Sequence, residues 1–445
     1  MDGQDIAATG TRHIVQNNRL HPGFPSPTGR RQACRRGIIV WMTLLNQPGP
    51  LHILRTPPTL PLALASLLLG LAVAACSSGT DATVAPLPTV PPPATPTSVP
   101  SPTITPKPSP PATGESVSPT KQPFVSLPGD EGAHLTPIEW WYFNGLLTDD
   151  TGADYSFHYV TFQSVLPNGF TPRLLQLSWA DHRKEVYLTD ERPELPLLEA
   201  TNSVFSFQVN DWSMAGDGTD YSLTFNTGEY SVALQAVSNK PATLHQGKGL
   251  VDLGRAGESY YYSRTRLATT GTLTVGEEQR QVTGLAWMDH QWGDFSIAPV
   301  GWDWMSLQLD DGSDLMISMV WDSTDHQPIN SYGTYVPPNG QPRNISGENI
   351  SLTATGSWTS AVTGTTFPVG WNLEVESLNL SLTLTPALLD SEFQGSKYVP
   401  PAYWEGAVHV NGTRNGQTVT GNGFAELVGY DTRKFEFPNL GEINK

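Results

Sequence analysis

The chain has 445 residues, a formal net charge of −17 at pH 7 and two cysteines. From residue 77 onward 18 Lys and Arg stand against 40 Asp and Glu, because seven of the 25 basic and two of the 42 acidic residues lie earlier. Such an acidic surface argues against nucleic acid as a partner, whereas a neutral, apolar ligand meets no such barrier. Cys34 and Cys76 both precede the part with a globular composition, which excludes a thiol nucleophile, a cysteine zinc site and an internal disulfide there.

An apolar segment ends directly before the second cysteine. Residues 60–75 are rich in Leu and Ala and follow an arginine. The segment is short for a membrane-spanning helix, and small residues before a cysteine are typical of signal cleavage. The string Val-Ala-Ala-Cys at 73–76 resembles a bacterial lipobox, which implies that Cys76 is lipidated and anchors the protein to a membrane outside the cytoplasm. An uncleaved signal anchor is the alternative. We expect residues 1–76 to be a non-globular N-terminus with a lipoprotein signal peptide, and Met42 to mark the true start.

The next segment is rich in proline. Residues 77–123 contain fourteen of the 39 prolines, mixed with Thr, Ser and Ala. This composition cannot bury a core and favours extended polyproline conformations. We therefore predict a disordered stalk between the lipid anchor and the globular part.

Strand patterns dominate from residue 124 onward. Apolar and polar side chains alternate with a period of two over residues 155–162, 230–237 and 378–385. Pairs such as Asn168-Gly169 are typical of tight hairpin turns. Many short strands joined by hairpins predict an all-β antiparallel fold, either a barrel or a sandwich.

The strand rhythm breaks once, at residues 296–300. This break predicts two β-domains, at 124–298 and 299–445. The seam between two domains is a common place for a ligand site.

The segment just before this break is the most specific in the chain. It places Asp289 beside His290 among four tryptophans within eighteen positions, Trp287, Trp292, Trp302 and Trp304. Indole rings are costly to leave in water, so they suggest a dry pocket in which burial raises the pKa of an acid and lowers that of a histidine. Such a pocket suits proton transfer on an apolar molecule, or binding of one.

Strand geometry divides this segment between two faces. If residues 286–292 form a strand, Met288, His290 and Trp292 share one face, and Trp287, Asp289 and Gln291 share the other. We expect His290 to face the pocket beside Trp292, and Asp289 to cap a turn or to pair across the seam. The alternative is that both are hydrogen-bonded polar residues of the core.

A second aromatic string supplies further candidates. In Glu139-Trp140-Trp141-Tyr142-Phe143, Glu139 shares a face with Trp141. It either enters the pocket as a desolvated acid or bonds backbone at a barrel end. His158 either faces the same interior or is a core residue.

The candidate residues form two groups. Asp289, His290 and Glu139 are the candidate catalytic residues, and Trp141, Tyr142, His158, Trp292, Trp302 and Trp304 are the candidate substrate-binding residues. The seven histidines after Cys76 show no His-x-His or His-Glu-x-x-His spacing, so neither a metal nor another cofactor is predicted. A Gly-x-Ser-x-Gly nucleophile motif is also absent from the sequence.

Three strings carry a family resemblance: Pro137–Gly145, the segment around Met288–Gly293, and Tyr403–Gly406. They resemble the AttH and carotenoid 1,2-hydratase (hydroxyneurosporene synthase) group, over roughly residues 130–432. The resemblance implies two lipocalin-like antiparallel β-barrels. Carotenoid 1,2-hydratases add water to the terminal double bond of acyclic carotenoids without a cofactor, and His290 and Trp292 match their His-x-Trp. Residues 314–320 depart from the hydratases, which carry a Tyr-x-Asp in this strand.

Together with the lipobox, this resemblance implies a lipid-anchored protein outside the cytoplasm that acts on an apolar isoprenoid or lipid. Water addition to an alkene needs a strong acid and aromatic faces that stabilise a cation. Glu139 or Asp289 is the expected acid and His290 the relay. A lipocalin-like carrier for apolar ligands, or a hydrolase or isomerase of the same family, is the alternative.

Overall fold

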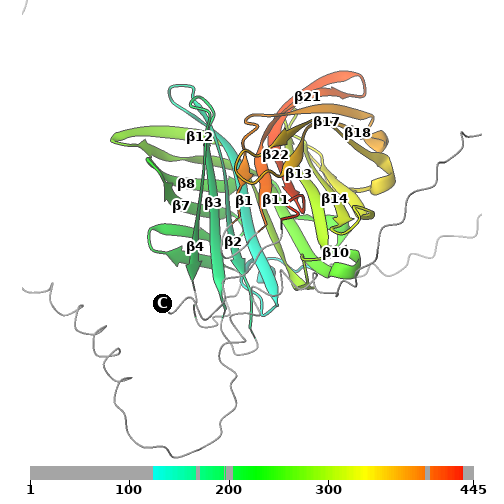
Figure 1. Cartoon of the computed structure of the whole chain (residues 1–445), viewed down its shortest axis with the longest axis horizontal. Coiled ribbons are helices and arrows are strands. Elements are labelled where there is room, and N and C mark those ends of the chain that lie inside the picture. The colour runs from blue at the N-terminus through cyan, green and yellow to red at the C-terminus, as the bar shows by residue number, and fades with distance from the viewer. Residues whose placement is uncertain (1–123, 167–170, 195, 197–203, 396–400, 434–445) are drawn as a thin grey trace, which may run out of the picture. The chain divides into compact units, whose positions relative to one another are not determined.

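The computed structural model describes residues 124–166, 171–194, 196, 204–395 and 401–433. The predicted signal peptide, the lipidation site at Cys76 and the stalk at 77–123 lie outside these residues and stay predictions. Within the described residues, no helix is both long enough and apolar enough to span a membrane. The chain is all-β, as predicted, and its strands form two curled antiparallel sheets that make two barrels (Figure 1).

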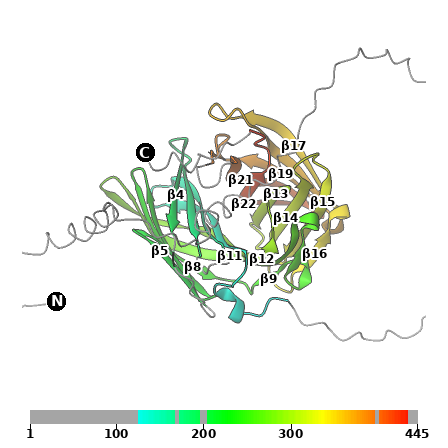
Figure 2. The same ribbon diagram turned by 60° about the horizontal axis from the view of Figure 1, so that its bottom comes forward.

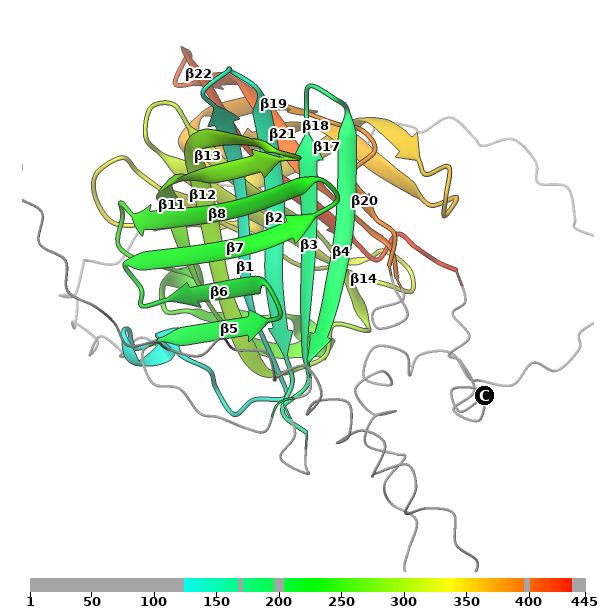
Figure 3. The same cartoon turned by 90° about the vertical axis from the view of Figure 1, so that its left-hand side faces the viewer.

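The first sheet contains the strands up to residue 295. Its main path runs in the order β4 (Val186–Glu194), β3 (Arg173–Asp181), β2 (Asp154–Gln163), β1 (Ile138–Asp149), β12 (Glu278–Phe295), β11 (Gly257–Val275), β8 (Tyr230–Ser238), β7 (Asp220–Thr227), β6 (Trp212–Gly216) and β5 (Phe205–Val209). Two short strands, β9 (Thr243–Leu244) and β10 (Leu250–Asp252), pair with β11. Figure 3 shows β5 to β8 crossing over β1 to β4, so the sheet folds back on itself.

The second sheet begins after a short connection at 296–299. Its main path runs in the order β16 (Arg343–Ser346), β15 (Pro328–Val336), β14 (Asp314–Asp322), β13 (Val300–Leu309), β22 (Gln417–Val428), β21 (Tyr403–Arg414), β19 (Leu380–Pro386), β18 (Thr366–Val375) and β17 (Ile350–Thr359). The short β20 (Glu392–Phe393) pairs with β21. In Figure 2 these strands surround a common centre. Five single-turn 3₁₀ helices complete the described elements: η1 (Gly129–Glu131), η2 (His245–Gly247), η3 (Gly254–Ala256), η4 (Gly347–Asn349) and η5 (Glu376–Leu378).

Buried apolar side chains form three clusters. One fills the first barrel and includes Trp141 and Trp292, and another fills the second and includes Trp404. The third lies between the two sheets and joins residues of both, such as Tyr142 and Trp304. This third cluster forms the interface layer between the two sheets. One face of β1 and β12 therefore points into the first barrel, and the opposite face points into the interface layer. The division into two domains, at 124–298 and 299–445, stays a prediction.

Candidate functional site

The interface layer is built from every second side chain of five strands. Successive side chains of a strand point to opposite faces, so those that point into the layer come in rows about 7 Å apart. Each row continues from strand to strand, because its members are paired in the registers of β1 with β12, of β13 with β22 and of β21 with β22. The acid row comprises Tyr142, Asp289, Trp304, Glu405 and Glu426. The middle row comprises Asn144, Trp287, Ser306, Ala407 and Phe424. The outer row comprises Leu146, Leu285, Gln308, His409 and Asn422.

Glu405 is the most unusual member of the acid row. Its side chain is 1% exposed, and it lies on β21 directly opposite Glu426 on β22. The Tyr142 hydroxyl of the other sheet donates to its Oε1, and His158 Nδ1 lies 3.1 Å from its Oε2. Burial, and then the neighbouring charge of Glu426, raise the pKa of Glu405 well above its ordinary value. This shift favours the protonated form of the carboxyl group.

Glu426 faces the same layer from the next strand. Its side chain is half-buried, and Trp302 Nε1 donates to its Oε2 at 3.2 Å. Burial raises the pKa of Glu426 to about 7, although the Trp302 hydrogen bond opposes the shift. Trp302 is also only half-buried, so these two side chains lie where the acid row meets the surface.

His158 supports Glu405 from β2. It is completely buried, and burial lowers its pKa to about 3, so the ring is neutral at physiological pH. Its Nδ1 lies 2.7 Å from Ser178 Oγ, and its Nε2 lies 3.4 Å from the Tyr403 hydroxyl. According to its tautomer, the neutral ring either donates from Nδ1 to the Glu405 carboxylate or accepts from the protonated carboxyl group.

Asp289 has a different environment within the same row. Its two oxygens accept hydrogen bonds from the Tyr261 hydroxyl at 2.6 Å, from Trp287 Nε1 at 2.6 Å and from Ser263 Oγ. Trp304 Nε1 donates in turn to the Tyr261 hydroxyl at 3.1 Å, which links the set to the second sheet. Burial raises the pKa of Asp289 to about 6, against the effect of its three donors. All three donors belong to the first sheet, so this carboxyl group is linked to the second sheet only through Tyr261 and Trp304.

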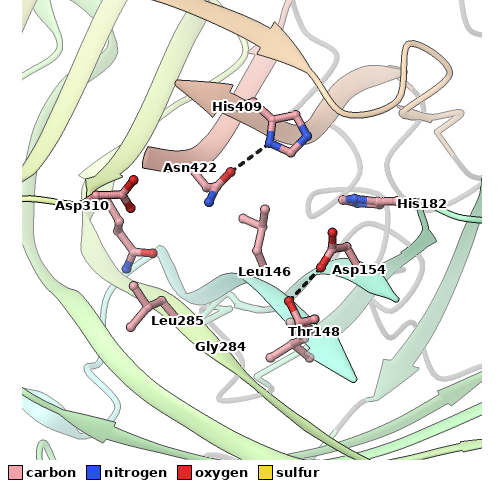
Figure 4. A pocket seen from close by; sticks show the side chains of 11 residues that line it. Leu146, Thr148, Asp154, His182, Gly284, Leu285, Asp310, His409 and Asn422 are labelled. Atoms are coloured by element: carbon pink, nitrogen blue, oxygen red, sulfur yellow. Dashed lines mark hydrogen bonds between the residues drawn. The ribbon is translucent and has the colours of Figure 1, made fainter. Parts of the chain in front are cut away.

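A pocket of about 230 Å³ opens at the outer row (Figure 4). All five outer-row residues line it, together with Asp154 and His182. The middle row, with Asn144 Nδ2 donating to Ser306 Oγ at 3.1 Å, lies between this pocket and the acid row. A second pocket, of about 270 Å³, is lined by Asp303, Trp321 and Tyr430. Within the described residues neither pocket is lined by Glu139, Asp289 or His290.

A second polar cluster lies on the other face of β1 and β12, inside the first barrel. Glu139 Oε1 lies 2.8 Å from His290 Nε2 and 2.7 Å from Nδ1 of His134, which precedes β1. Trp141 stacks on His290 with ring centroids 4.6 Å apart, and Trp292 stacks on His134 at 4.1 Å. Burial lowers the pKa of His290, although Glu139 opposes the shift.

The structure divides the candidate residues between two places. His290, Glu139, Trp141 and Trp292 lie inside the first barrel, whereas Asp289, Tyr142, His158, Trp302 and Trp304 face the interface layer. The physical reason is the strand period, which sends neighbouring residues such as Asp289 and His290 to opposite faces.

Sequence reasoning missed several polar partners. Glu405 stood in one of the family strings, but its isolated position gave no reason to choose it. Glu426 carried no signal, since only the pairing of β21 with β22 places it opposite Glu405. His134 was one of the scattered histidines, and its spacing to Glu139 matches none of the metal motifs.

Two curled antiparallel sheets with filled interiors and a polar interface layer define a protein of two lipocalin-like barrels. The AttH-like family model matches residues 118–430, and the chain belongs to that family. The chain is similar to the crystal structure of an AttH protein from Nitrosomonas europaea, with 27% identity, a TM-score of 0.63 and coverage of 71% of this chain and 99% of that one. It shares its fold with kievitone hydratase from Nectria haematococca, with 16% identity, a TM-score of 0.58 and coverage of 69% and 93%. A comparison with curated protein sequences gives no match.

Proposed function

We propose that this protein is a hydratase-type enzyme that adds water to a carbon–carbon double bond of a neutral, apolar substrate in the interface layer. The observation that carries the proposal is the buried Glu405 carboxyl group, opposite Glu426 and in contact with Tyr142 and His158. Two acids directly opposite each other, one of them fully buried, favour a state in which at least one is protonated. A carboxylic acid that is still protonated at neutral pH is the general acid that alkene hydration needs.

The proposed reaction has two steps. The alkene π electrons take the Glu405 proton, so that a carbon–hydrogen bond forms and the other alkene carbon becomes a cation. Water then adds through its oxygen to this cation and releases one proton, which returns to the Glu405 carboxylate. The sum is one alkene and one water converted to one alcohol, with the acid regenerated.

Aromatic side chains of the acid row suit the cationic stage. The Tyr142 and Trp304 rings lie 5.6 Å apart in an edge-to-face arrangement, one from each sheet. A desolvated cation over the face of either ring is stabilised by about 2 kcal/mol when water is excluded. His158 and Tyr142 act as positioning residues, because they hold the two oxygens of Glu405.

The substrate class follows from the net charge of the chain and from the composition of the interface layer. The net charge of −17 disfavours anionic substrates, and apolar or aromatic residues make up much of the interface layer. The resemblance to carotenoid 1,2-hydratases and the name of the structurally similar kievitone hydratase both support water addition as the reaction class. An acyclic isoprenoid with a terminal double bond fits these requirements.

This proposal changes the roles that were expected from the sequence. Asp289 becomes a structural residue of the interface, because three donors occupy its oxygens. His290 and Glu139 lie on the far face of the first sheet and take no part in the proposed proton transfer.

The test compares two buried glutamates of the second barrel in the full-length protein. Glu405→Gln keeps the size of the side chain but removes its acidic proton. Glu392→Gln is the matched control, since Glu392 on β20 is 2% exposed and its two oxygens accept hydrogen bonds from Ser360 and Thr363 of the second barrel. Each protein is incubated with acyclic carotenoids, and the gain of one water is followed by mass spectrometry.

We expect wild type and Glu392→Gln to form the alcohol and Glu405→Gln to be slower by about 100-fold or more. Equal rates in Glu405→Gln and wild type would refute the assignment of the acid. Tight retention of unchanged carotenoid by all three proteins would instead support a carrier and overturn the proposed enzyme activity.

A further inference from the structure

We infer that His134, Glu139 and His290 form a binding site for a divalent transition metal at one end of the first barrel. The three ligand atoms, one from each side chain, all lie within 4.8 Å of one another. Two imidazoles and one carboxylate are a donor set that zinc uses when it keeps one coordination position open. This inference is independent of the proposed hydratase activity, which involves the other face of the sheet.

The hydrogen bonds around His290 leave its inward nitrogen without a proton. The Tyr262 hydroxyl donates its single proton to Glu131 Oε2 at 2.7 Å. The Tyr262 oxygen then faces His290 Nδ1, 3.2 Å away, as an acceptor, so the imidazole proton lies on Nδ1. The lone pair on Nε2 therefore points at Glu139 Oε1, 2.8 Å away. Two lone pairs in contact repel each other unless a proton or a metal ion lies between them.

His134 approaches the same oxygen from the loop before β1. Its Nε2 lies 3.5 Å from Asp130 Oδ1, which favours a proton on that nitrogen. Its Nδ1 then presents a second lone pair to Glu139 Oε1 at 2.7 Å. The other carboxylate oxygen of Glu139 is already held, by the His134 backbone N–H at 2.8 Å and by Gln163 Nε2 at 3.4 Å. Oε1 is thus the oxygen that remains for a metal.

Each ligand is oriented by an outer partner, as in established metal sites. Trp141 and Trp292 stack on the two imidazole rings and fix their planes. Zinc bonds of about 2.0–2.1 Å place tetrahedral ligand atoms about 3.3 Å apart, so each nitrogen needs to move outward by about 0.5 Å. His134 lies on a loop and its side chain is 21% exposed, which provides both this movement and a path for the ion.

The charge around the site favours a cation. Glu139 and the two outer acids, Asp130 and Glu131, surround the three ligand atoms, and Arg264 pairs with Glu131. Negative charges therefore exceed positive ones among these groups. A divalent ion corrects this imbalance.

The experiment titrates the full-length protein, after treatment with a chelator and dialysis, with Co²⁺ and with Zn²⁺. Bound Co²⁺ in a four- or five-coordinate nitrogen and oxygen site gives visible absorption bands that aqueous Co²⁺ lacks, and Zn²⁺ binding is followed by calorimetry. His134→Ala is the main variant, because a partly exposed loop residue is replaceable without loss of the fold. His182→Ala is the matched control, since His182 is also a partly exposed histidine but lies at the outer row of the interface.

We expect one equivalent of metal to bind to wild type and to His182→Ala, and His134→Ala to bind at least about 100-fold more weakly. Tyr262→Phe, which removes the partner of His290 Nδ1, should weaken binding by about 10-fold or more. Glu405→Gln should bind metal like the wild type, whatever its effect on turnover. Failure of wild type to develop the cobalt bands at one equivalent, or equal affinity in His134→Ala, would overturn the inference.

Discussion

At the scale of single residues, the interface layer contains two kinds of acid. Asp289 has a structural role, whereas Glu405 has the environment of a catalytic acid. The two oxygens of Asp289 accept hydrogen bonds from three donors, as buried polar groups usually do. Glu405 instead lies against another acid, an arrangement that destabilises a sheet when both groups are charged. Such an arrangement is costly to keep for stability alone, and it sets the pKa values that acid catalysis requires.

The first prediction concerns the pH dependence of stability. The pKa of Glu426 is about 7 in the folded protein and about 4.5 without burial. Below pH 4.5 the carboxyl group is protonated in both states, whereas between pH 4.5 and 7 only the unfolded state releases the proton. The free energy of unfolding should therefore fall as the pH rises through this range.

Urea denaturation at several pH values checks this prediction. Glu426→Gln should show a shallower fall than the wild type, with the remaining fall due to groups such as Asp303, whose pKa burial raises to about 6. An identical slope in the variant and the wild type would be inconsistent with a raised pKa at Glu426.

At the scale of elements, a glycine on strand β22 lets this strand lie close to β13. It lies between β13 and β21 in the second sheet, and Gly423 pairs with Leu307 of β13 and with Val408 of β21. A Cβ atom at Gly423 would lie 2.1 Å from the Ser306 carbonyl oxygen. Since this is a backbone atom, no side-chain rotation relieves the clash.

Gly423→Ala should therefore lower the free energy of unfolding by about 2 kcal/mol or more, as overpacking does elsewhere. Gly129→Ala is a control, because nothing lies within 4 Å of a Cβ atom at that position. Chemical denaturation of both variants measures the difference. A Gly423→Ala protein as stable as the wild type would contradict the close approach of β13 and β22.

The strand period explains how far the sequence predicted these elements. Alternation over residues 286–292 correctly separated His290 and Trp292 from Asp289, because the period depends only on local backbone geometry. It did not show that the outward face of the first barrel is covered by a second sheet. The contact between Tyr142 and Glu405, 263 residues apart, depends on that tertiary packing and has no local signal.

At the scale of the whole molecule, buried ion pairs join the two sheets. Asp314 on β14 is 0% exposed. It forms ion pairs at 2.7 Å with Lys240 and with Arg266, which both belong to the first barrel. Thr265 Oγ1 of the same barrel donates to it at 2.8 Å. Asp314 begins the stretch in which hydratases carry their Tyr-x-Asp, and here it is a bridge between the sheets. Loss of one partner of a buried ion pair leaves the other charges uncompensated.

Asp314→Asn should thus lower the free energy of unfolding by about 3 kcal/mol or more. Asp311→Asn, which breaks a partly exposed pair with Arg414, should cost less than about 1 kcal/mol. Thermal and chemical denaturation of the two variants provides the comparison. A smaller effect for Asp314→Asn than for Asp311→Asn would show that the bridge does not hold the sheets together.

The proposal that Glu405 is the general acid is tested most directly by measuring whether its carboxyl group is protonated at neutral pH. This measurement needs no substrate. Infrared spectroscopy resolves the carbonyl stretch of a protonated carboxyl group from that of a carboxylate. At pH 7 we expect the protonated carboxyl band to be weaker in Glu405→Gln than in the wild type and Glu392→Gln, with the remainder due to groups such as Glu426. A band that is unchanged in Glu405→Gln would mean that Glu405 is ionised, and the proposed acid would have no proton to give.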